Sequence, residues 1–244
     1  MRPKFVPFAL VLLALAASMI GAEMAHAGDA SDYELLRLDS HLVKWGKPAV
    51  GAPARVSYAL IDQPLSSPGA RNCGAMAPIE PLLEKSKIAP AAFQQELEAA
   101  LGMWERAANI TFVASGDPMH ADILIGASTA PKGPAYTNVE YDHTAPADDT
   151  GVRAIAQSLI CFDPMRAWKI GFDGNTKIYD VRYTLAHELG HAIGLDHPGP
   201  HGALMGFDYR EEFRTLQPGD VAGLQQLYGA PQPAIALTAG HNPS

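Results

Sequence analysis

The stretch of sequence that decides the fold reads HELGHAIGLDH and runs from His187 to His197. On a helix, residues four apart lie on one face, so His187 and His191 present their imidazole rings on the same side. Glu188 follows the first histidine and can reach a water molecule on a shared ion without binding the ion itself. Gly194 tolerates the left-handed conformation that ends a helix, and the redirected chain can then bring back His197. The stretch therefore predicts a helix ending at Gly194 and three imidazoles that share one ion.

The ligand types and their number indicate a catalytic zinc site. Three protein ligands leave a fourth tetrahedral position for water, whereas a structural zinc site is closed by four. We therefore expect one catalytic Zn²⁺ held by His187, His191 and His197, with Glu188 as general base. The alternative is two solvent-facing histidines on an ordinary helix. The short HExxH pattern alone does not exclude it, but each further position of H-E-x-x-H-x-x-G-x-x-H has its own physical role.

Composition indicates a globular protein of one large or two small domains. The chain has 244 residues, of which 48% are hydrophobic and 18% charged, so it can bury a real core. The formal net charge is -8, and no run of Lys and Arg occurs. These features disfavour nucleic acid and anionic membrane surfaces as partners.

The N-terminus has the features of an export signal. Arg2 and Lys4 precede an apolar stretch from Phe8 to Ile20, which is short for a membrane span. The small residues of Ala25-His26-Ala27 predict cleavage after Ala27, and an uncleaved membrane anchor is the alternative. No other stretch is apolar enough to cross a bilayer. We expect a secreted, or else periplasmic, monomer with no membrane contact after cleavage.

The residues after the signal divide into a lead-in, a catalytic domain and a tail. We expect an irregular lead-in at 28–44, one domain at 45–229 and a loose, Pro/Ala-rich tail at 230–244. Phe93, Leu97, Leu101 and Trp104 recur at helical spacing and predict a helix over 91–108 that begins with Pro90. The expected strands are 56–61, 110–113, 122–125, an edge strand near 136–141, and 158–162.

The other segments of the domain are predicted to be loops or capped helices. Residues 62–89 and 128–152 are rich in turn-forming residues and are expected to be mostly loop. Asp180 is a suitable N-cap for the histidine-bearing helix. A last helix is expected to start near Pro218 and stop at Gly229.

Two cysteines, Cys73 and Cys161, lie in the exported part of the chain. An oxidising compartment favours a disulfide between them. Closing a loop of nearly 90 residues would stabilise the fold by about 4 kcal/mol on a chain-entropy argument. The alternative is a free thiol of Cys73 that binds the catalytic metal in place of water.

The histidine stretch and the residues after it resemble the metzincin zinc proteases. Metzincins carry a methionine turn beneath the metal, and Met205 in Ala-Leu-Met-Gly fits that turn. It follows His197 by eight residues, the short spacing of the matrixin (matrix-metalloproteinase-like) branch. Tyr209 stands where matrixins have the tyrosine that borders the S1′ pocket. Tyr183 stands where matrixins limit the depth of that pocket, which implies a shallow apolar pocket. Packing of Tyr183 in the core is the alternative.

The similarity covers about 45–229 and is dense only from residue 180 onward. It implies an α+β fold, in which a twisted, mostly parallel five-stranded sheet packs against three main helices. It also implies a zinc-dependent endopeptidase acting on polypeptides.

The departures from the matrixin pattern concern the other metals and the activation mechanism. Cys161 stands where a histidine of a second zinc site is expected, so we expect no second zinc. Asp122 and Asp163 match calcium ligands, but Arg166 replaces a ligating Glu, so the sequence leaves Ca²⁺ open without supporting it. Only residues 28–44 precede the domain, so we expect a bacterial-style chain without a long pro-domain. Arg-Asn-Cys-Gly around Cys73 faintly resembles the inhibitory cysteine motif, but it follows the first strand.

Three functions remain in competition. The first is an active secreted endopeptidase that uses Glu188 to activate a zinc-bound water. The second is a catalytically silent binding protein that retains the metal, but it would be expected to lack Glu188 or a ligand, and none is lost. The third is a hydrolase of other amide bonds, which zinc chemistry alone does not exclude.

Overall fold

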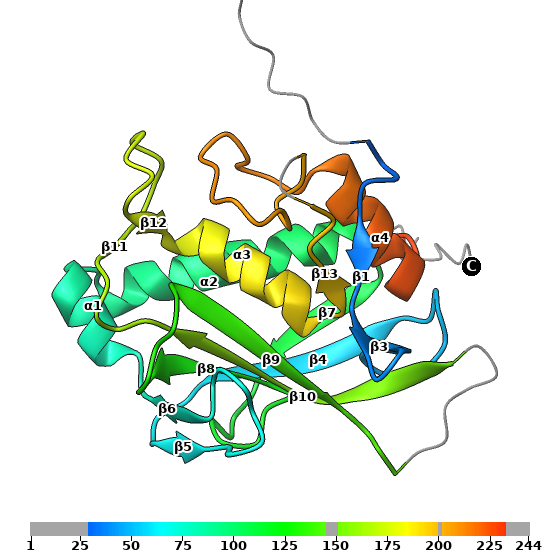
Figure 1. The fold of residues 1–244 in the computed structure, drawn as a ribbon, viewed down its shortest axis with the longest axis horizontal. Helices are drawn as coiled ribbons and strands as arrows, with labels where there is room; N and C mark the ends of the chain where they lie inside the picture. Colours follow the sequence, from blue (N-terminus) through cyan, green and yellow to red (C-terminus); the bar gives the residue numbers. More distant parts are fainter. Residues whose placement is uncertain (1–28, 145–150, 200–201, 233–244) are drawn as a thin grey trace, which may run out of the picture.

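A computed structural model describes residues 29–144, 151–199 and 202–232. Figure 1 shows the sheet with two long helices packed across one face. The helices in the described residues are α1 (Glu80–Ser86), α2 (Pro90–Ala107), α3 (Val181–Ala192) and α4 (Pro218–Tyr228). The strands are β1 (Glu34–Leu35), β2 (Arg37–Leu38), β3 (His41–Lys44), β4 (Ala54–Leu60), β5 (Leu65–Ser66), β6 (Ala75–Ala77), β7 (Ile110–Ala114), β8 (Ile123–Ser128), β9 (Ala135–Tyr141), β10 (Val152–Phe162), β11 (Trp168–Lys169), β12 (Tyr179–Asp180) and β13 (Leu195–Asp196).

The five longest strands form the expected sheet, in the order β7-β4-β8-β10-β9. The first four run parallel, and β9 is antiparallel to β10 at the edge. The strand β8 is buried throughout, as a central parallel strand should be. The shorter strands β2, β3, β5 and β6 extend this sheet to nine strands. The predicted α+β class with a mostly parallel central sheet is therefore confirmed.

The helix α3 is fixed at both ends by side chains from other elements. The Asp180 carboxylate accepts the Tyr183 N–H at 2.8 Å, so the predicted N-cap is present. The indole N–H of Trp104 in α2 donates to the Ala186 carbonyl at 3.0 Å. The indole N–H of Trp45 donates to the Ala192 carbonyl at 2.8 Å. These bonds hold the histidine-bearing helix against α2 and the start of the domain.

The predicted turn at the end of α3 is also present. Gly194 has a φ of 102°, which is the left-handed region that favours glycine. A Cβ at this position would clash with the Val43 carbonyl oxygen, so the chain also needs glycine for a close approach. The predicted helices at 91–108 and 218–229 agree with α2 and α4 to within one residue.

The prediction of an irregular lead-in at 28–44 was wrong. The segment forms β1, β2 and β3; β3 lies parallel to β10, and β1 pairs with β13, which directly precedes His197. Strands β1 and β2 are only two residues long, too short to show an alternating pattern. The lead-in is thus packed into the catalytic domain.

The prediction that 62–89 is a long loop was also wrong in part. It contains the hairpin of β5 and β6 and the short helix α1. The α1 side chains Leu82 and Leu83 are buried, which explains why a short helix is stable there. The turn-forming residues of the segment lie between these short elements, and their number led to the prediction of a loop.

Some predictions concern residues outside the described ranges. The predicted signal at 1–27 and most of the predicted tail at 230–244 fall there. Within the described residues, no helix is long and apolar enough to cross a bilayer.

Candidate metal centre

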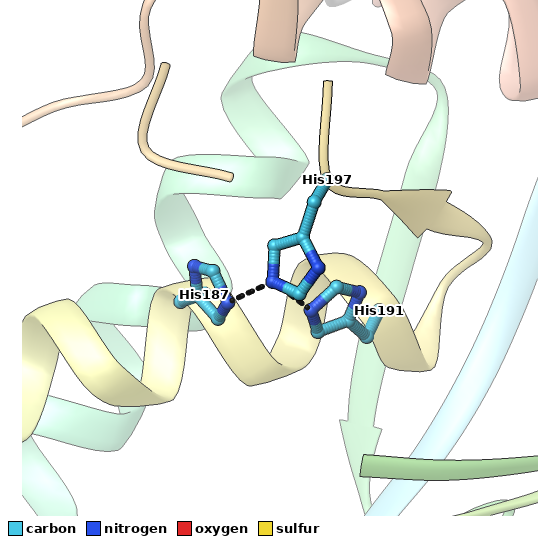
Figure 2. Close-up of side chains that lie close together, drawn as sticks. All are labelled: His187, His191 and His197. Carbon is cyan, nitrogen blue, oxygen red and sulfur yellow. Dashed lines mark hydrogen bonds between the residues drawn. The ribbon is translucent and has the colours of Figure 1, made fainter. Parts of the chain in front are cut away.

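Three imidazole rings meet at one point beside α3. Figure 2 shows His187 and His191 rising from the helix and His197 approaching from the segment after β13. The Nε2 atom of His197 lies 3.1 Å from Nε2 of His187 and 3.2 Å from Nε2 of His191. Zinc–nitrogen bonds of about 2.0–2.1 Å in a tetrahedron place ligand nitrogens about 3.3 Å apart, so the spacing suits zinc. This is the one group of three or more metal-binding side chains within the described residues.

Hydrogen bonds on the far side of the rings orient the site. The Nδ1 atom of His187 lies 2.9 Å from the Leu204 carbonyl, and that of His191 lies 2.9 Å from the Leu195 carbonyl. A carbonyl only accepts, so Nδ1 must carry the proton in both rings and Nε2 must present a lone pair. Several lone pairs at hydrogen-bond distance repel one another unless a cation lies between them. The residues therefore fit a bound metal ion.

The environment keeps the three rings neutral, as metal ligands must be. Burial lowers the pKa of His187 and takes that of His191 well below its usual value. Burial, with a smaller contribution from His187, lowers the pKa of His197 to about 4. At neutral pH all three imidazoles are therefore available to bind a cation.

Glu188 lies beside the triad with almost no exposure to solvent. Its side chain is 6% exposed. Its Oε2 atom accepts a hydrogen bond of 2.7 Å from the Thr137 hydroxyl on β9. Burial raises the pKa of Glu188 to about 7, and the Thr137 hydrogen bond opposes that rise. A carboxylate with a pKa near neutrality suits the exchange of protons with water.

Comparison with known proteins identifies the family. A family model described as matrixin matches residues 82–229, which is more than half of the chain. This chain belongs to the matrixin family. The match confirms the resemblance that the histidine stretch and the methionine turn predicted.

Curated relatives of this matrixin include proteins from animals and plants. Human stromelysin-3 is 28% identical over 151 residues, which is 58% of this chain and 28% of the relative. Metalloendoproteinase 4-MMP of Arabidopsis thaliana is 28% identical over 151 residues, covering 58% of this chain and 42% of the relative. Human matrix metalloproteinase-19 is 42% identical over 77 residues, covering 30% of this chain and 14% of the relative. The matrixin chain thus spans less than half the length of each.

A buried network of hydrogen bonds and close packing supports the segment next to the three histidines. The Leu204 and Met205 N–H groups donate to the Asp220 carboxylate at 2.9 and 3.1 Å, which fixes the predicted methionine turn. A Cβ at Gly190 would clash with the Met205 sulfur, so the helix and the turn pack closely there. Gly190, like Gly194, is therefore a glycine of the histidine motif that close packing requires.

Tyr183 and Tyr209, the two predicted pocket residues, contact each other. Their ring centroids are 4.8 Å apart in an edge-to-face arrangement. The Tyr209 hydroxyl accepts the Asp180 N–H and donates to Glu211, each at 2.9 Å. The Tyr183 hydroxyl donates to the Asp208 carbonyl at 3.2 Å. Both rings line the cleft of about 690 Å³ that contains the three histidines and Glu188.

The disulfide between Cys73 and Cys161 is present. Both cysteines are buried on the side of the sheet away from the helices, in a small core with Leu124 and Leu159. The sulfur of Cys73 is bonded to Cys161, so the alternative of a Cys73 thiol on the metal does not hold in this structure.

The proposed calcium positions are engaged with protein donors. The Asp122 carboxylate accepts the Ser57 N–H at 2.7 Å and the Ser57 hydroxyl at 2.8 Å. The Asp163 carboxylate accepts the Met165 N–H at 2.8 Å and forms an ion pair with Arg166 at 3.3 Å. Arg166 therefore supplies a positive charge next to Asp163, where a ligating Glu was expected.

The sequence did not indicate several residues of the cleft. Leu36 and Leu38 from the N-terminal segment line it, as does Thr137 from β9. Phe207 is 66% exposed, and its ring stacks on His197 with centroids 4.2 Å apart. These residues carry no motif, and only the folded chain brings them to the metal centre.

Proposed function

We propose that this matrixin is a zinc-dependent endopeptidase that acts outside the cytoplasm. The observation that carries the proposal is the convergence of three imidazole lone pairs next to the buried carboxylate of Glu188. His187, His191 and His197 would hold the zinc. When bound, zinc supplies Lewis acidity, which lowers the pKa of a coordinated water toward neutrality and polarises a carbonyl.

Glu188 would act as the general base and then as the general acid of the reaction. Its carboxylate takes a proton from the water that attacks the peptide carbonyl and then passes it to the leaving amine. A general acid and base of this kind contributes a factor of about 10²–10⁴ to the rate. Burial in the cleft excludes competing water and keeps this carboxylate close to the reacting atoms.

The shape of the cleft favours an extended polypeptide as substrate. Within the described residues, β9 pairs only with β10, so its other edge can form backbone hydrogen bonds with a bound chain. Tyr183 and Tyr209 supply an apolar pocket near the metal. Tyr183 also lines a separate cavity of about 240 Å³. We propose that the Tyr183 ring, which is 5% exposed, limits the depth of the pocket, and that the enzyme prefers Leu or similar side chains after the cleaved bond.

The specificity proposal can be tested by cleavage of a peptide library. We expect Leu and comparable apolar residues to be enriched directly after the scissile bond. A dominant preference for a charged residue at that position would contradict the proposed pocket.

The catalytic proposal is tested by replacing Glu188 with glutamine. Glu188→Gln keeps the size of the side chain and all three histidines but removes the base, so kcat should fall by about 10²-fold or more. The zinc content should stay unchanged. The matched control is Glu98→Gln on the exposed face of α2, which should cleave at the wild-type rate. Retained activity in Glu188→Gln would refute the assigned role.

Export and the alternative function follow from the same residues. The predicted signal at 1–27 supports a secreted or periplasmic location. No observation favours a catalytically silent binding protein, since Glu188 and the three histidines are all present and brought together.

A further inference from the structure

The hydroxyl of Thr137 is the side-chain partner of the Glu188 carboxylate. Its Oγ1 atom lies 2.7 Å from Oε2 of Glu188 and 3.0 Å from the Glu188 carbonyl oxygen. A carbonyl inside a helix already accepts the N–H four residues on, so the carboxylate has the greater need of the hydroxyl proton. Among the described residues, no other side chain donates a hydrogen bond to this carboxylate.

The strand β9 holds Thr137 in place through its neighbour on the opposite face. Successive side chains of a strand point to opposite sides, so Thr137 faces α3 while Asn138 faces away from it. The Asn138 side-chain oxygen accepts the Asn72 N–H at 3.0 Å and the Cys73 N–H at 2.9 Å. Cys73 is in turn bonded to Cys161 on β10. The loop tethered by the disulfide therefore anchors an edge strand that, within the described part of the chain, pairs with β10 alone.

The hydrogen bond from Thr137 distinguishes the two carboxylate oxygens of Glu188. The hydroxyl occupies Oε2 of Glu188, which leaves Oε1 for the water to be activated. A general base that swings freely would spend less time at the reacting water, and a misplacement of about 1 Å costs about 10²-fold in rate. The contact joins β9 to α3 across 51 residues of sequence, so it depends on the folded cleft.

We propose that Thr137 is a positioning residue that orients Glu188 for proton transfer. The inference rests on the proposed endopeptidase function and adds a second side chain to its catalytic apparatus. Thr137 itself does not touch the reacting atoms. It acts through the direction in which it holds the Glu188 carboxylate.

The test compares Thr137→Val with Thr137→Ser. Valine keeps the β-branched shape that suits a strand but removes the donor, whereas serine keeps the hydroxyl. Loss of a hydrogen bond to a charged group corresponds to a fall in kcat of about 10- to 100-fold, with little change in KM. Thr137→Ser should restore kcat to within about threefold of wild type. Thr111→Val, an exposed threonine-to-valine change on β7, is the matched control and should leave kcat unchanged.

A second readout does not depend on activity. Crystal structures of metal-free wild type and metal-free Thr137→Val should differ in the direction of the Glu188 carboxylate, while the three histidines keep their places. An unmoved carboxylate, or wild-type kcat in Thr137→Val, would overturn the inference. These outcomes are distinct from failure of the proposed function, in which the wild-type protein itself would not cleave peptides.

Discussion

Gly194 shows how a single residue sets the geometry of the metal centre. It ends α3 with a φ of 102° and passes close to the Val43 carbonyl oxygen. Three residues later the chain delivers His197 to the other two ligands. Any side chain at this position would have to displace β3 or change the course of the chain, and both changes would move the third imidazole.

Gly194→Ala should weaken both the fold and the metal site. We expect the free energy of unfolding to fall by about 1–3 kcal/mol, because the alanine meets a strained backbone and a steric clash. Zinc affinity should fall as well, since His197 is displaced. Gly116→Ala is the control, because a Cβ there has no heavy atom within 4 Å. Urea denaturation and chelator competition would measure the two effects, and wild-type values for both would contradict this account.

The convergence of the three histidines was predictable from sequence because their arrangement is local. Two of them share one helix face, and a glycine supplies the turn to the third, so eleven residues of chain contain the whole geometry. Thr137 was not predictable, because its position beside Glu188 depends on how β9 packs against α3. The tyrosine pocket was found only through resemblance to the family. Spacing alone gave no reason to bring Tyr183 and Tyr209 together.

At the scale of elements, the N-terminal segment packs against the chain that carries His197. The strand β1 pairs antiparallel with β13, and the Leu36 N–H donates to the Gly194 carbonyl at 2.8 Å. A glycine at 219 allows the backbone of Asp32 to lie directly against α4. Figure 1 shows β1 running beside β13 and α4. The segment thus acts as a clamp, in the sense that its hydrogen bonds hold the chain that carries His197. Strands of two residues have no recognisable sequence pattern, so this role could not be predicted.

Removal of this clamp should reduce zinc affinity. A chain that begins at Arg37 loses β1 and the Leu36 hydrogen bond but keeps all three histidines and Glu188. Loss of groups that orient metal ligands costs about 10- to 100-fold in metal affinity. Competition with a chelator would compare this chain with one that begins at Gly28. Equal affinities would show that β1 does not support the site.

At the scale of the whole molecule, buried ionisable groups shape the stability of the fold. The Lys44 ammonium is fully buried and donates to the Trp45 and Lys47 carbonyls, each at 2.8 Å. Burial lowers the pKa of Lys44 to about 8. Burial also raises the pKa of Tyr183 to about 12 and that of Tyr228 further. The lysine and the tyrosines therefore affect stability in opposite directions as the pH rises.

We predict that stability rises from about pH 8 to about pH 10 and falls above it. In the first range the unfolded chain still holds the Lys44 proton that the folded chain has lost, so unfolding becomes less favourable by about 1–2 kcal/mol. Above that range unfolded tyrosines lose protons that the buried ones keep, so stability decreases. Urea denaturation across this pH range would measure the curve. Lys44→Met should abolish the rise, and a variant that retains it would contradict the assignment to Lys44.

The whole architecture was predicted less completely than its centre. The five longest strands, α2, α3 and α4 each carry an apolar run, a helical repeat or a motif long enough to recognise. The hairpin of β5 and β6, the helix α1 and the strands of the lead-in are short, and they are stabilised by what they pack against. Their positions depend on contacts with distant parts of the chain, which a local sequence pattern does not contain.

The measurement that tests the central claim most directly is the zinc content of the purified protein after exhaustive dialysis. The geometry of His187, His191 and His197 predicts one zinc per chain. It also predicts loss of that zinc in His197→Ala and its retention in His120→Ala, a change at an exposed histidine. A wild-type chain without stoichiometric zinc, or a His197→Ala chain that holds zinc as tightly as wild type, would contradict the claim.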